Sequence, residues 1–186
     1  MKIEISRISE KDTDELYQLF DNVIKDNFLF EGYTLESLQD GIQQCINQPM
    51  EGIKSDFESE GKDNYHLIAK INGKIIGTMA HGTLSETVYK NTSFKNGIRE
   101  IKSAYILPDY QNKGVGSILL NAILLSLYQT DIKKVCIYSG FKKGIAFWEK
   151  KFGKAPIILK DYFDKDVDCL IWHKELKDII IEYNVK

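Results

Sequence analysis

The chain has 186 residues, of which 43% are hydrophobic and 28% are charged, so it is long enough to bury one sizeable core and has an ordinary globular composition. Its formal net charge is −2 at pH 7, from 25 Lys and Arg against 27 Asp and Glu. A nucleic-acid-binding protein usually shows a basic excess, so no nucleic-acid partner is expected.

The apolar segments are too short to cross a membrane. The longest one, Ile118 to Leu127, is interrupted by Asn121 and Ser126, and a spanning helix needs about 20 apolar residues. The first residues alternate polar and apolar side chains, which indicates a strand rather than a signal peptide. The three cysteines lie far apart and lack CxxC spacing, which favours free thiols in a reducing compartment. We therefore expect a cytoplasmic protein with no membrane partner.

The N-terminal third predicts one strand and two helices. Residues 2–8 alternate as in a strand, and apolar residues at helical spacing follow from Leu16 onward. A second helix is expected over 35–47 and should end at Pro49. The aromatic stretch 27–33 has no period and is predicted to be a loop between the helices.

The middle of the chain predicts a hairpin between two polar loops. Tyr65–Ile71 and Lys74–Ala80 are rich in strand-forming residues and flank Asn72-Gly73, the strongest hairpin signal in the sequence. The loops are expected at 52–63 and 85–97.

The C-terminal half predicts a long strand over Ile98–Leu107, ended by Pro108, and a nearly all-apolar helix of about four turns that Gly114 opens. Then follow a strand (Lys133–Ser139), a helix (Lys142–Phe152) stopped by Gly153, and two strands (Ala155–Leu159 and Val167–His173) around an Asp/Lys turn. This order predicts a mixed α/β sheet with helices on its faces, in one domain over residues 1–186.

The segment between Pro108 and the following helix carries the functional signal. Gly114 and Gly116 remove side chains where backbone N–H groups converge on a helix N-terminus, which favours binding of a diphosphate. A Walker A loop needs a lysine after its last glycine, whereas Lys113 precedes Gly114. A dinucleotide fingerprint needs a third glycine, whereas position 119 is Leu119. Neither nucleotide motif fits.

Gln111-Asn112-Lys113-Gly114-Val115-Gly116 matches the pattern Gln/Arg-x-x-Gly-x-Gly/Ala and resembles the acetyl-CoA pyrophosphate loop of the GNAT acetyltransferases. The order of elements over roughly residues 2–175 is also similar to that family. The resemblance implies a central, mostly antiparallel sheet flanked by helices, with acetyl-CoA as cosubstrate. It assigns the pantetheine arm to the backbone of Ile106 and Leu107. It assigns the pyrophosphate to the amides of Gln111, Asn112, Lys113, Gly114, Val115, Gly116 and Ser117. A simple tight turn at the two glycines is the alternative.

The implied reaction moves an acetyl group from a thioester to an amine. The amine must be neutral to attack, so a general base would help. Glu100 lies 11 residues before Gln111, where a subset of GNAT enzymes carries a catalytic glutamate. The alternative is a solvated strand carboxylate.

The family's general-acid tyrosine aligns with Trp148, whose indole N–H is not a useful acid. Tyr138 is the candidate substitute. Trp148 is either a packing residue or part of the CoA channel, and Ser139 is a candidate hydrogen-bond partner of the pantetheine.

The acceptor wall that the family implies comes from the first two helices and their connection. Here it would contain Phe28, Phe30, Glu31 and Tyr33, and aromatic rings with a carboxylate suit a small amine. Core packing is the alternative for the two phenylalanines. The histidines are isolated and lack ligand spacing, so no metal is expected.

Together these features predict an N-acetyltransferase in which a primary amine of a small molecule or peptide attacks acetyl-CoA directly. We expect a monomer or a homodimer, formed through the last strand or the isoleucines at 179–181. Two alternatives stay open: a non-catalytic acyl-CoA-binding or regulatory domain of the same fold, and a phosphate-binding enzyme of another class.

Overall fold

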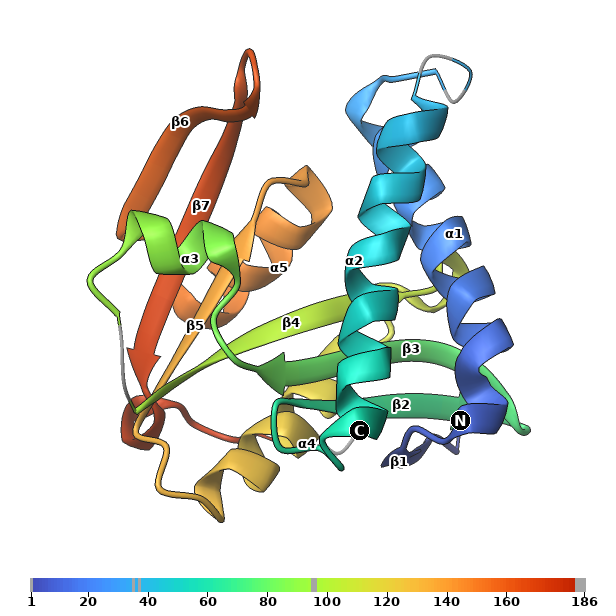
Figure 1. The fold of residues 1–186 in the computed structure, drawn as a ribbon, viewed down its shortest axis with the longest axis vertical. Helices are drawn as coiled ribbons and strands as arrows, with labels where there is room; N and C mark the ends of the chain where they lie inside the picture. The colour runs from blue at the N-terminus through green and yellow to red at the C-terminus, as the bar shows by residue number, and fades with distance from the viewer. Residues whose placement is uncertain (1, 35, 37, 95–96, 183–186) are drawn as a thin grey trace.

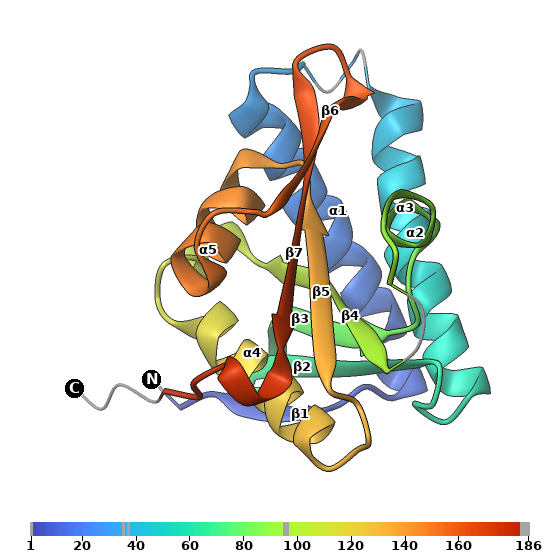
Figure 2. The ribbon, with the colours of Figure 1, turned by 90° about the vertical axis from the view of Figure 1, so that its left-hand side faces the viewer.

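The computed structural model describes residues 2–34, 36, 38–94 and 97–182. Within these residues seven strands form one sheet in the order β1-β2-β3-β4-β5-β7-β6 (Figures 1 and 2). Only β4 and β5 run parallel among the neighbouring strands described, and the other pairs are antiparallel. The strands are β1 (Glu4–Arg7), β2 (Asn64–Ile71), β3 (Lys74–Gly82), β4 (Ile98–Ile106), β5 (Lys134–Ser139), β6 (Ile157–Asp164) and β7 (Val167–Glu175). The predicted mixed α/β architecture is confirmed.

Helices cover both faces of this sheet. The helices are α1 (Thr13–Glu31), α2 (Gln39–Glu58), α3 (Glu86–Asn91), α4 (Val115–Tyr128) and α5 (Lys142–Phe152), with short 3₁₀ turns η1 (Glu10–Asp12), η3 (Pro108–Tyr110) and η4 (Leu176–Asp178). On β2, Ile68 packs with the apolar residues of α1 and α2, whereas Leu67 and Ala69 pack with those of α4 and α5. Alternation along the strand thus divides the core into two layers.

The first helix continues through part of the stretch predicted to be a loop, so that prediction is wrong for residues 27–31. Helix α1 ends at Glu31 because Gly32 adopts a left-handed φ of +94°. The N–H groups of Gly32 and Tyr33 donate to the carbonyls of Leu29 and Phe28, both at 3.0 Å. Such a glycine cap was the sequence signal for a helix end at this position.

The second helix does not end at Pro49, and the loop predicted at 52–63 is wrong up to Glu58. Pro49 lies inside α2 and is buried. The buried positions on α2 are Ile42, Ile46, Pro49, Ile53 and Asp56, which recur every three or four residues. That stripe anchors the helix on the sheet on both sides of the proline, so packing outweighs the lost hydrogen bond. The predicted start of this helix at residue 35 lies outside the described residues.

A short helix occupies part of the second predicted loop, which is therefore wrong for residues 86–91. Ser85 caps α3 because its side chain accepts a hydrogen bond from the Val88 N–H. Val88 is fully buried against Ile98 of β4 and Cys136 of β5, in a third apolar cluster. Helix α3 is thereby fixed over the junction of these two strands.

The predicted hairpin at Asn72-Gly73 and the predicted bounds of α5 are confirmed. The predicted end of β6 at Leu159 is wrong, because the strand continues to Asp164 and leaves only Lys165 and Asp166 before β7. The segment after β7 lies against α4, where Tyr128 Oη donates to the Leu176 carbonyl at 2.5 Å. Ile179 and Ile181 pack against the core, and Ile180 is 77% exposed. Two of the three isoleucines suggested for a dimer contact thus pack within the chain. None of the described helices has the length and apolarity that would let it cross a membrane.

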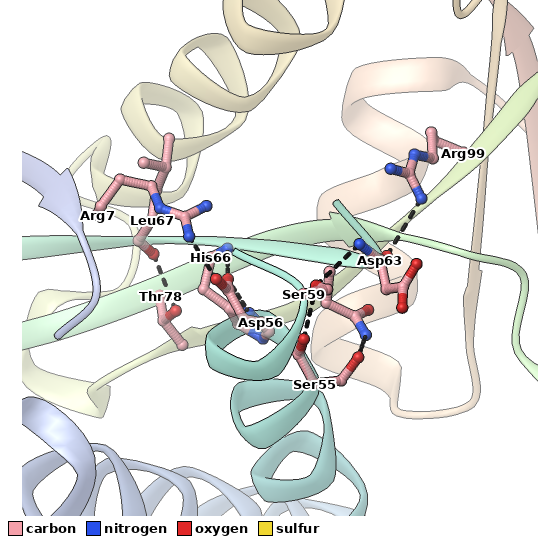
Figure 3. A network of polar contacts seen from close by, with 10 residues as sticks. Arg7, Ser55, Asp56, Ser59, Asp63, His66, Leu67, Thr78 and Arg99 are labelled. Atoms are coloured by element: carbon pink, nitrogen blue, oxygen red, sulfur yellow. Dashed lines mark hydrogen bonds and ion pairs between the residues drawn. The ribbon is translucent and has the colours of Figure 1, made fainter. Parts of the chain in front are cut away.

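A buried ion pair joins α2 to the edge of the sheet (Figure 3). The Asp56 carboxylate is fully buried and accepts from the Arg7 guanidinium, the His66 backbone N–H and His66 Nδ1. Burial lowers the pKa of His66, which keeps the ring neutral near pH 7. The carboxylate therefore ties β1, β2 and α2 together beyond the proline.

We predict that Asp56→Ala will lower the free energy of unfolding by about 3–5 kcal/mol, because it leaves the Arg7 cation without its buried partner. Urea denaturation followed by circular dichroism measures this change. Asp131→Ala, at an exposed turn after α4, is the control and should change stability by no more than about 0.5 kcal/mol. A loss below about 1 kcal/mol for Asp56→Ala would contradict the role assigned to this ion pair.

Candidate acyl-transfer site

The sheet separates between its two parallel strands. Pairing of β4 with β5 covers three residue pairs, from Ile98 opposite Lys134 to Glu100 opposite Cys136. Beyond that point β5 stays paired with β7 up to Ser139. On its other side β4 stays bonded to β3, and the Leu107 N–H donates to the Ile76 carbonyl at 3.0 Å. Strand β5 does not pair with β4 over residues 101–106, so this edge can bind an extended chain with amide groups, except at the Ile106 carbonyl, which accepts from Gln111 Nε2.

A bulge in β4 lies where the separation begins. The register between β3 and β4 shifts between Thr78 and Ala80, so β4 carries one extra residue. Ser103 lies in this stretch with a φ of +51°, which is unusual for a residue with a side chain. A bulge bends and twists its strand. It thus accounts for the divergence of β4 from β5.

The loop between β4 and α4 forms a backbone cradle. Asn112 and Gly114 both have left-handed φ values, +58° and +88°. Gln111 Nε2 donates to the Ile106 carbonyl at 3.0 Å, which folds the loop back on the strand end. The first N–H groups of an α-helix have no acceptor within the helix. Those of α4 therefore lie beside the exposed residues 112–114, where the helix dipole favours an anion.

The two glycines of the loop have different roles. No atom would lie within 4 Å of a Cβ on Gly114, so its role is the positive φ. A Cβ on Gly116 would lie 3.2 Å from Phe147 Cε2, so its role is the close approach of α5 to α4. Val115 between them is buried in the core and anchors the loop. The space beside Gly114 is open and that beside Gly116 is filled by Phe147, and the assignment of both backbone amides to the anion stays a prediction.

Glu100 lies on the α3 side of the sheet, at the last residue pair of β4 with β5. Its side chain is 1% exposed, unlike a solvated strand carboxylate. Oε2 accepts from the Ser85 N–H at 2.6 Å, and Oε1 lies 3.8 Å from Lys102 Nζ. Burial raises the pKa of Glu100, while Lys102 and the Ser85 hydrogen bonds oppose the rise. A carboxylate with a raised pKa is suited to accept a proton.

Tyr138 follows Cys136 along β5 and lies in the same cluster as α3. Its hydroxyl accepts from Gln48 Nε2 of α2 at 3.1 Å, and its ring stacks on Phe163 of β6 with 6.4 Å between centroids. Burial raises the pKa of Tyr138 to about 12, so the phenol keeps its proton near pH 7. The site thus gathers side chains from α2, β4, β5 and β6.

The two predicted cofactor residues beyond the loop, Trp148 on α5 and Ser139 at the end of β5, lie in different surroundings. Trp148 is 4% exposed and packs edge-on against Phe147 and parallel to Phe152, which makes it a core residue. Ser139 lies at the end of β5, where its Oγ is 3.4 Å from the Phe141 carbonyl. A Cβ on Gly144 would lie 2.4 Å from Ser139 Oγ, so this glycine lets α5 approach the strand end.

The predicted acceptor wall forms a contact between α1 and α5. Glu31 accepts from the Lys142 backbone N–H at 2.7 Å and pairs with Lys142 Nζ at 2.8 Å. It thereby caps α5, whose N-cap residue Phe141 has no capping side chain. Phe28 packs edge-on against Phe141 and Tyr33. Of the four predicted residues, then, Phe28 and Glu31 hold the end of α1 against the start of α5.

Phe30, the remaining member of that wall, is 57% exposed, and Lys143 Nζ lies 4.7 Å from the centre of its ring. Lys143 also pairs with Asp26 of α1 at 2.5 Å. These contacts add to the junction of α1 and α5 at the surface.

The sequence matches the model of the Acetyltransferase (GNAT) family over residues 30–153, which is more than half of the chain. The chain belongs to the GNAT acetyltransferase family. The matched region contains the separated strands, the backbone cradle and Glu100. Both the resemblance and the GNAT-like fold predicted from the sequence are confirmed.

Solved GNAT structures share this fold at low sequence identity. PaiA N-acetyltransferase from Thermoplasma acidophilum, in complex with coenzyme A, is 17% identical with a TM-score of 0.69, covering 94% of this chain and 100% of that one. The putative acetyltransferase yncA from Salmonella typhimurium, with acetyl-CoA, is 12% identical with a TM-score of 0.66, covering both chains fully at 100%. Ribosomal-protein-alanine N-acetyltransferase from Brucella melitensis is 16% identical with a TM-score of 0.65, covering 92% and 99%. No curated protein matches the sequence.

Sequence reasoning missed several residues of this GNAT site. Ser85 and Lys102 contact Glu100, while Gln48 and Phe163 contact Tyr138. The N-cap signal at Ser85-Glu86 was available in the sequence. The pairing of Glu100 with Lys102, two residues on along the same strand, also follows from strand alternation. The contacts of Gln48 and Phe163 with Tyr138 join residues far apart in the chain, and no spacing rule connects them.

We predict that Glu100→Gln will raise the free energy of unfolding at pH 7.5. The folded-state pKa of Glu100 lies above its ordinary value of 4.5, so Glu100 ionises less readily in the folded chain than in the unfolded one. The free energy of unfolding therefore falls as the pH rises from 4.5 through the folded-state pKa. Glutamine avoids this cost. Urea denaturation at pH 7.5 and pH 4 measures the change, and the difference between variant and wild type should shrink at the lower pH. A variant that is less stable at pH 7.5 would contradict this account.

Proposed function

We propose that the chain is an N-acetyltransferase that moves the acetyl group of acetyl-CoA to a primary amine. The observation that carries this proposal is the coincidence, in a GNAT chain, of an unpaired β4 edge, a backbone cradle at its end and a buried carboxylate at its start. These features lie along one strand, so the cradle would bind the pyrophosphate end of acetyl-CoA and Glu100 would lie near its thioester end.

Acetyl-CoA fits the residues present. The free N–H groups between Asn112 and Ser117, at the N-terminus of α4, suit a pyrophosphate, and no side chain fills the space beside Gly114. The pantetheine amides would pair with the free edge of β4 as an added strand does, approaching Ile106 and Leu107. Ser139 would contact this arm from β5. The thioester would then lie between the strands near Glu100. Packing accounts for Trp148 without a contact to CoA.

The reaction proposed is a direct transfer. The amine nitrogen attacks the thioester carbonyl, the N–C bond forms and the C–S bond breaks. Glu100 accepts the proton that the nitrogen loses, either directly or through a water molecule. Holding both reactants in line between the two strands supplies much of the rate. The leaving thiol has an ordinary pKa of about 8.5, so its thiolate departs with little help. Tyr138, protonated near pH 7, is the candidate donor to it.

The acceptor proposed is a small molecule or peptide with a primary amine. Phe163 and Tyr138 supply aromatic surface, and Gln48 supplies a polar group, on the α2 and β6 sides of Glu100. Tyr33, in the connection between α1 and α2, supplies a further ring. We place the protein in the cytoplasm, because Cys45, Cys136 and Cys169 are all free thiols. A monomer or a homodimer remains our proposal for the assembly, and β7, the last strand of the described chain, pairs with β5 and with β6 and so offers no free edge to a second copy.

We predict that wild-type protein will release CoA thiol from acetyl-CoA in the presence of at least one acceptor from a panel of spermidine, kanamycin, lysine and an alanine-terminated peptide. Glu100→Gln should lower that rate at least tenfold, since general base catalysis typically contributes about 10²–10⁴-fold. The matched control is Glu149→Gln, at an exposed position of α5, which should leave the rate unchanged.

The panel separates the alternatives. Binding of acetyl-CoA in calorimetry without release by any acceptor would favour a non-catalytic acyl-CoA-binding domain. Absence of acetyl-CoA binding would overturn the proposal. Competitive displacement of CoA by a nucleotide would favour a phosphate-binding enzyme of another class.

We predict that Gly114→Ala will weaken acetyl-CoA binding about 5- to 30-fold, because a left-handed φ costs an alanine roughly 1–2 kcal/mol and the loop will relax away from the cradle geometry. Isothermal calorimetry measures the affinity. Gly73→Ala is the matched control, because Gly73 has a φ of +79° and equal open space but lies in the β2–β3 turn. Equal losses of affinity in both variants would refute a specific role of the Gly114 loop.

A further inference from the structure

Glu100 accepts a hydrogen bond from the Ser85 amide and lies within ion-pair distance of the Lys102 ammonium. Its Oε2 accepts from the Ser85 N–H at 2.6 Å, and its Oε1 lies 3.8 Å from Lys102 Nζ. Lys102 Nζ in turn donates to the Thr83 carbonyl at 2.7 Å. Thr83 and Ser85 both belong to the short connection between β3 and α3. One connection thus positions the amide that binds the carboxylate and the ammonium beside it.

The geometry of Ser85 directs its N–H group toward the sheet. As the N-cap residue of α3, Ser85 has an extended backbone, with φ −66° and ψ 160°. Its side chain accepts from Val88 N, which leaves its own backbone N–H for Glu100. Val88 is fully buried and anchors α3 on β4 and β5. The position of the donor is therefore fixed by packing and not by the exposed surface of the helix.

The elements around Glu100 carry further titratable groups, which are Cys136 and Tyr138 on β5, Cys169 and His173 on β7, Glu86 and Lys90 on α3, and His66 on β2. Burial raises the pKa of both thiols and of the phenol, and it lowers that of the imidazole on β2, so these four groups are neutral near pH 7. The two charged α3 residues pair with each other at the surface, and the β7 histidine is exposed. Lys102 is therefore the positive charge beside the carboxylate.

We propose that the Ser85 amide and the Lys102 ammonium act together to keep Glu100 ionised, which makes them positioning residues for the base of the acetyl transfer. This inference rests on the proposed function of Glu100. A carboxylate that is 1% exposed would otherwise hold its proton and could not accept one from the acceptor amine. Hydrogen bonds to the charged form and a nearby opposite charge are the two effects that offset such burial.

The test compares two pairs of variants. Ser85→Pro removes the backbone N–H, and the native φ of −66° is the one that proline requires. Ser85→Ala keeps that N–H and removes the hydroxyl, which caps α3 and also hydrogen-bonds to Glu100. Lys102→Met removes the charge while keeping a long side chain, and Lys102→Arg restores a charge. Should Ser85→Pro fail to fold, the Lys102 pair still decides the question.

The first readout is the pKa of Glu100, measured by NMR of protein labelled with ¹³C at the glutamate carboxyl and assigned with Glu100→Gln. Ser85→Pro and Lys102→Met should each raise this pKa by about 1 or more, a tenfold change in the ionisation constant. Lys102→Arg should keep the pKa close to that of the wild type, and Ser85→Ala, which retains the backbone donor and loses only the hydroxyl, should raise it less than Ser85→Pro does. Equal values in all variants would overturn the proposal, because a purely structural role would not move the pKa.

The second readout is the pH profile of kcat/KM with acetyl-CoA and the acceptor that reacts fastest in the panel. The base must be ionised, so a raised pKa should move the acidic limb of the profile to higher pH in Ser85→Pro and Lys102→Met. If the pKa of Glu100 rises but the acidic limb does not move, Glu100 is not the base of the reaction. The inference that Ser85 and Lys102 keep Glu100 ionised would still hold in that case. A shift of neither quantity refutes the inference itself.

Discussion

The break in pairing between β4 and β5 is the constraint on which the other features of this chain depend. A sheet satisfies its backbone groups by continuous pairing, and here the two parallel strands share only three residue pairs. The bulge at Ser103 turns β4 away, and the apolar residues of α4 and α5 on one face and of α1 and α2 on the other hold the two halves of the sheet in place. The separation begins directly after Glu100, the last residue of β4 that pairs with β5. Glu100 therefore lies at one end of an extended site, and the backbone cradle after β4 lies at the other end.

Burial of a carboxylate in this position lowers the stability of the fold but favours proton transfer. A fold gains nothing from an ionised glutamate that is 1% exposed, and burial raises its pKa toward the range useful for proton transfer. The connection from β3 to α3 limits that rise through the Ser85 amide and through Thr83, which holds Lys102. By contrast, the buried Asp56 carboxylate accepts from Arg7 and His66 and serves to join α2 to the sheet (Figure 3). Two buried carboxylates on one face of the sheet thus differ in role because their partners differ.

The order of the elements along the chain and most of their bounds followed from the sequence because they depend on local signals. The Asn72-Gly73 turn, the Gly114 start of α4 and the Gly153 stop of α5 each act over a few residues. The end of α2 did not follow, because Pro49 argued for a stop and the buried residue that continues the helix, Asp56, looks solvated in the sequence. In the site, the backbone cradle was predictable from its glycines. The burial of Trp148 against α4 and the sheet, the α5 cap at Glu31 and the Ser85 donor to Glu100 depend on contacts between segments that only the fold brings together.

A crystal structure of the chain with bound CoA tests the central claim most directly. The account predicts that pyrophosphate oxygens lie within about 3.2 Å of backbone nitrogens between Asn112 and Ser117, and that the pantetheine amides pair with the free edge of β4. The sulfur should then lie between β4 and β5, on the side toward Glu100. A diphosphate bound elsewhere on the molecule, or strands that pair continuously where the pantetheine is expected, would contradict the account.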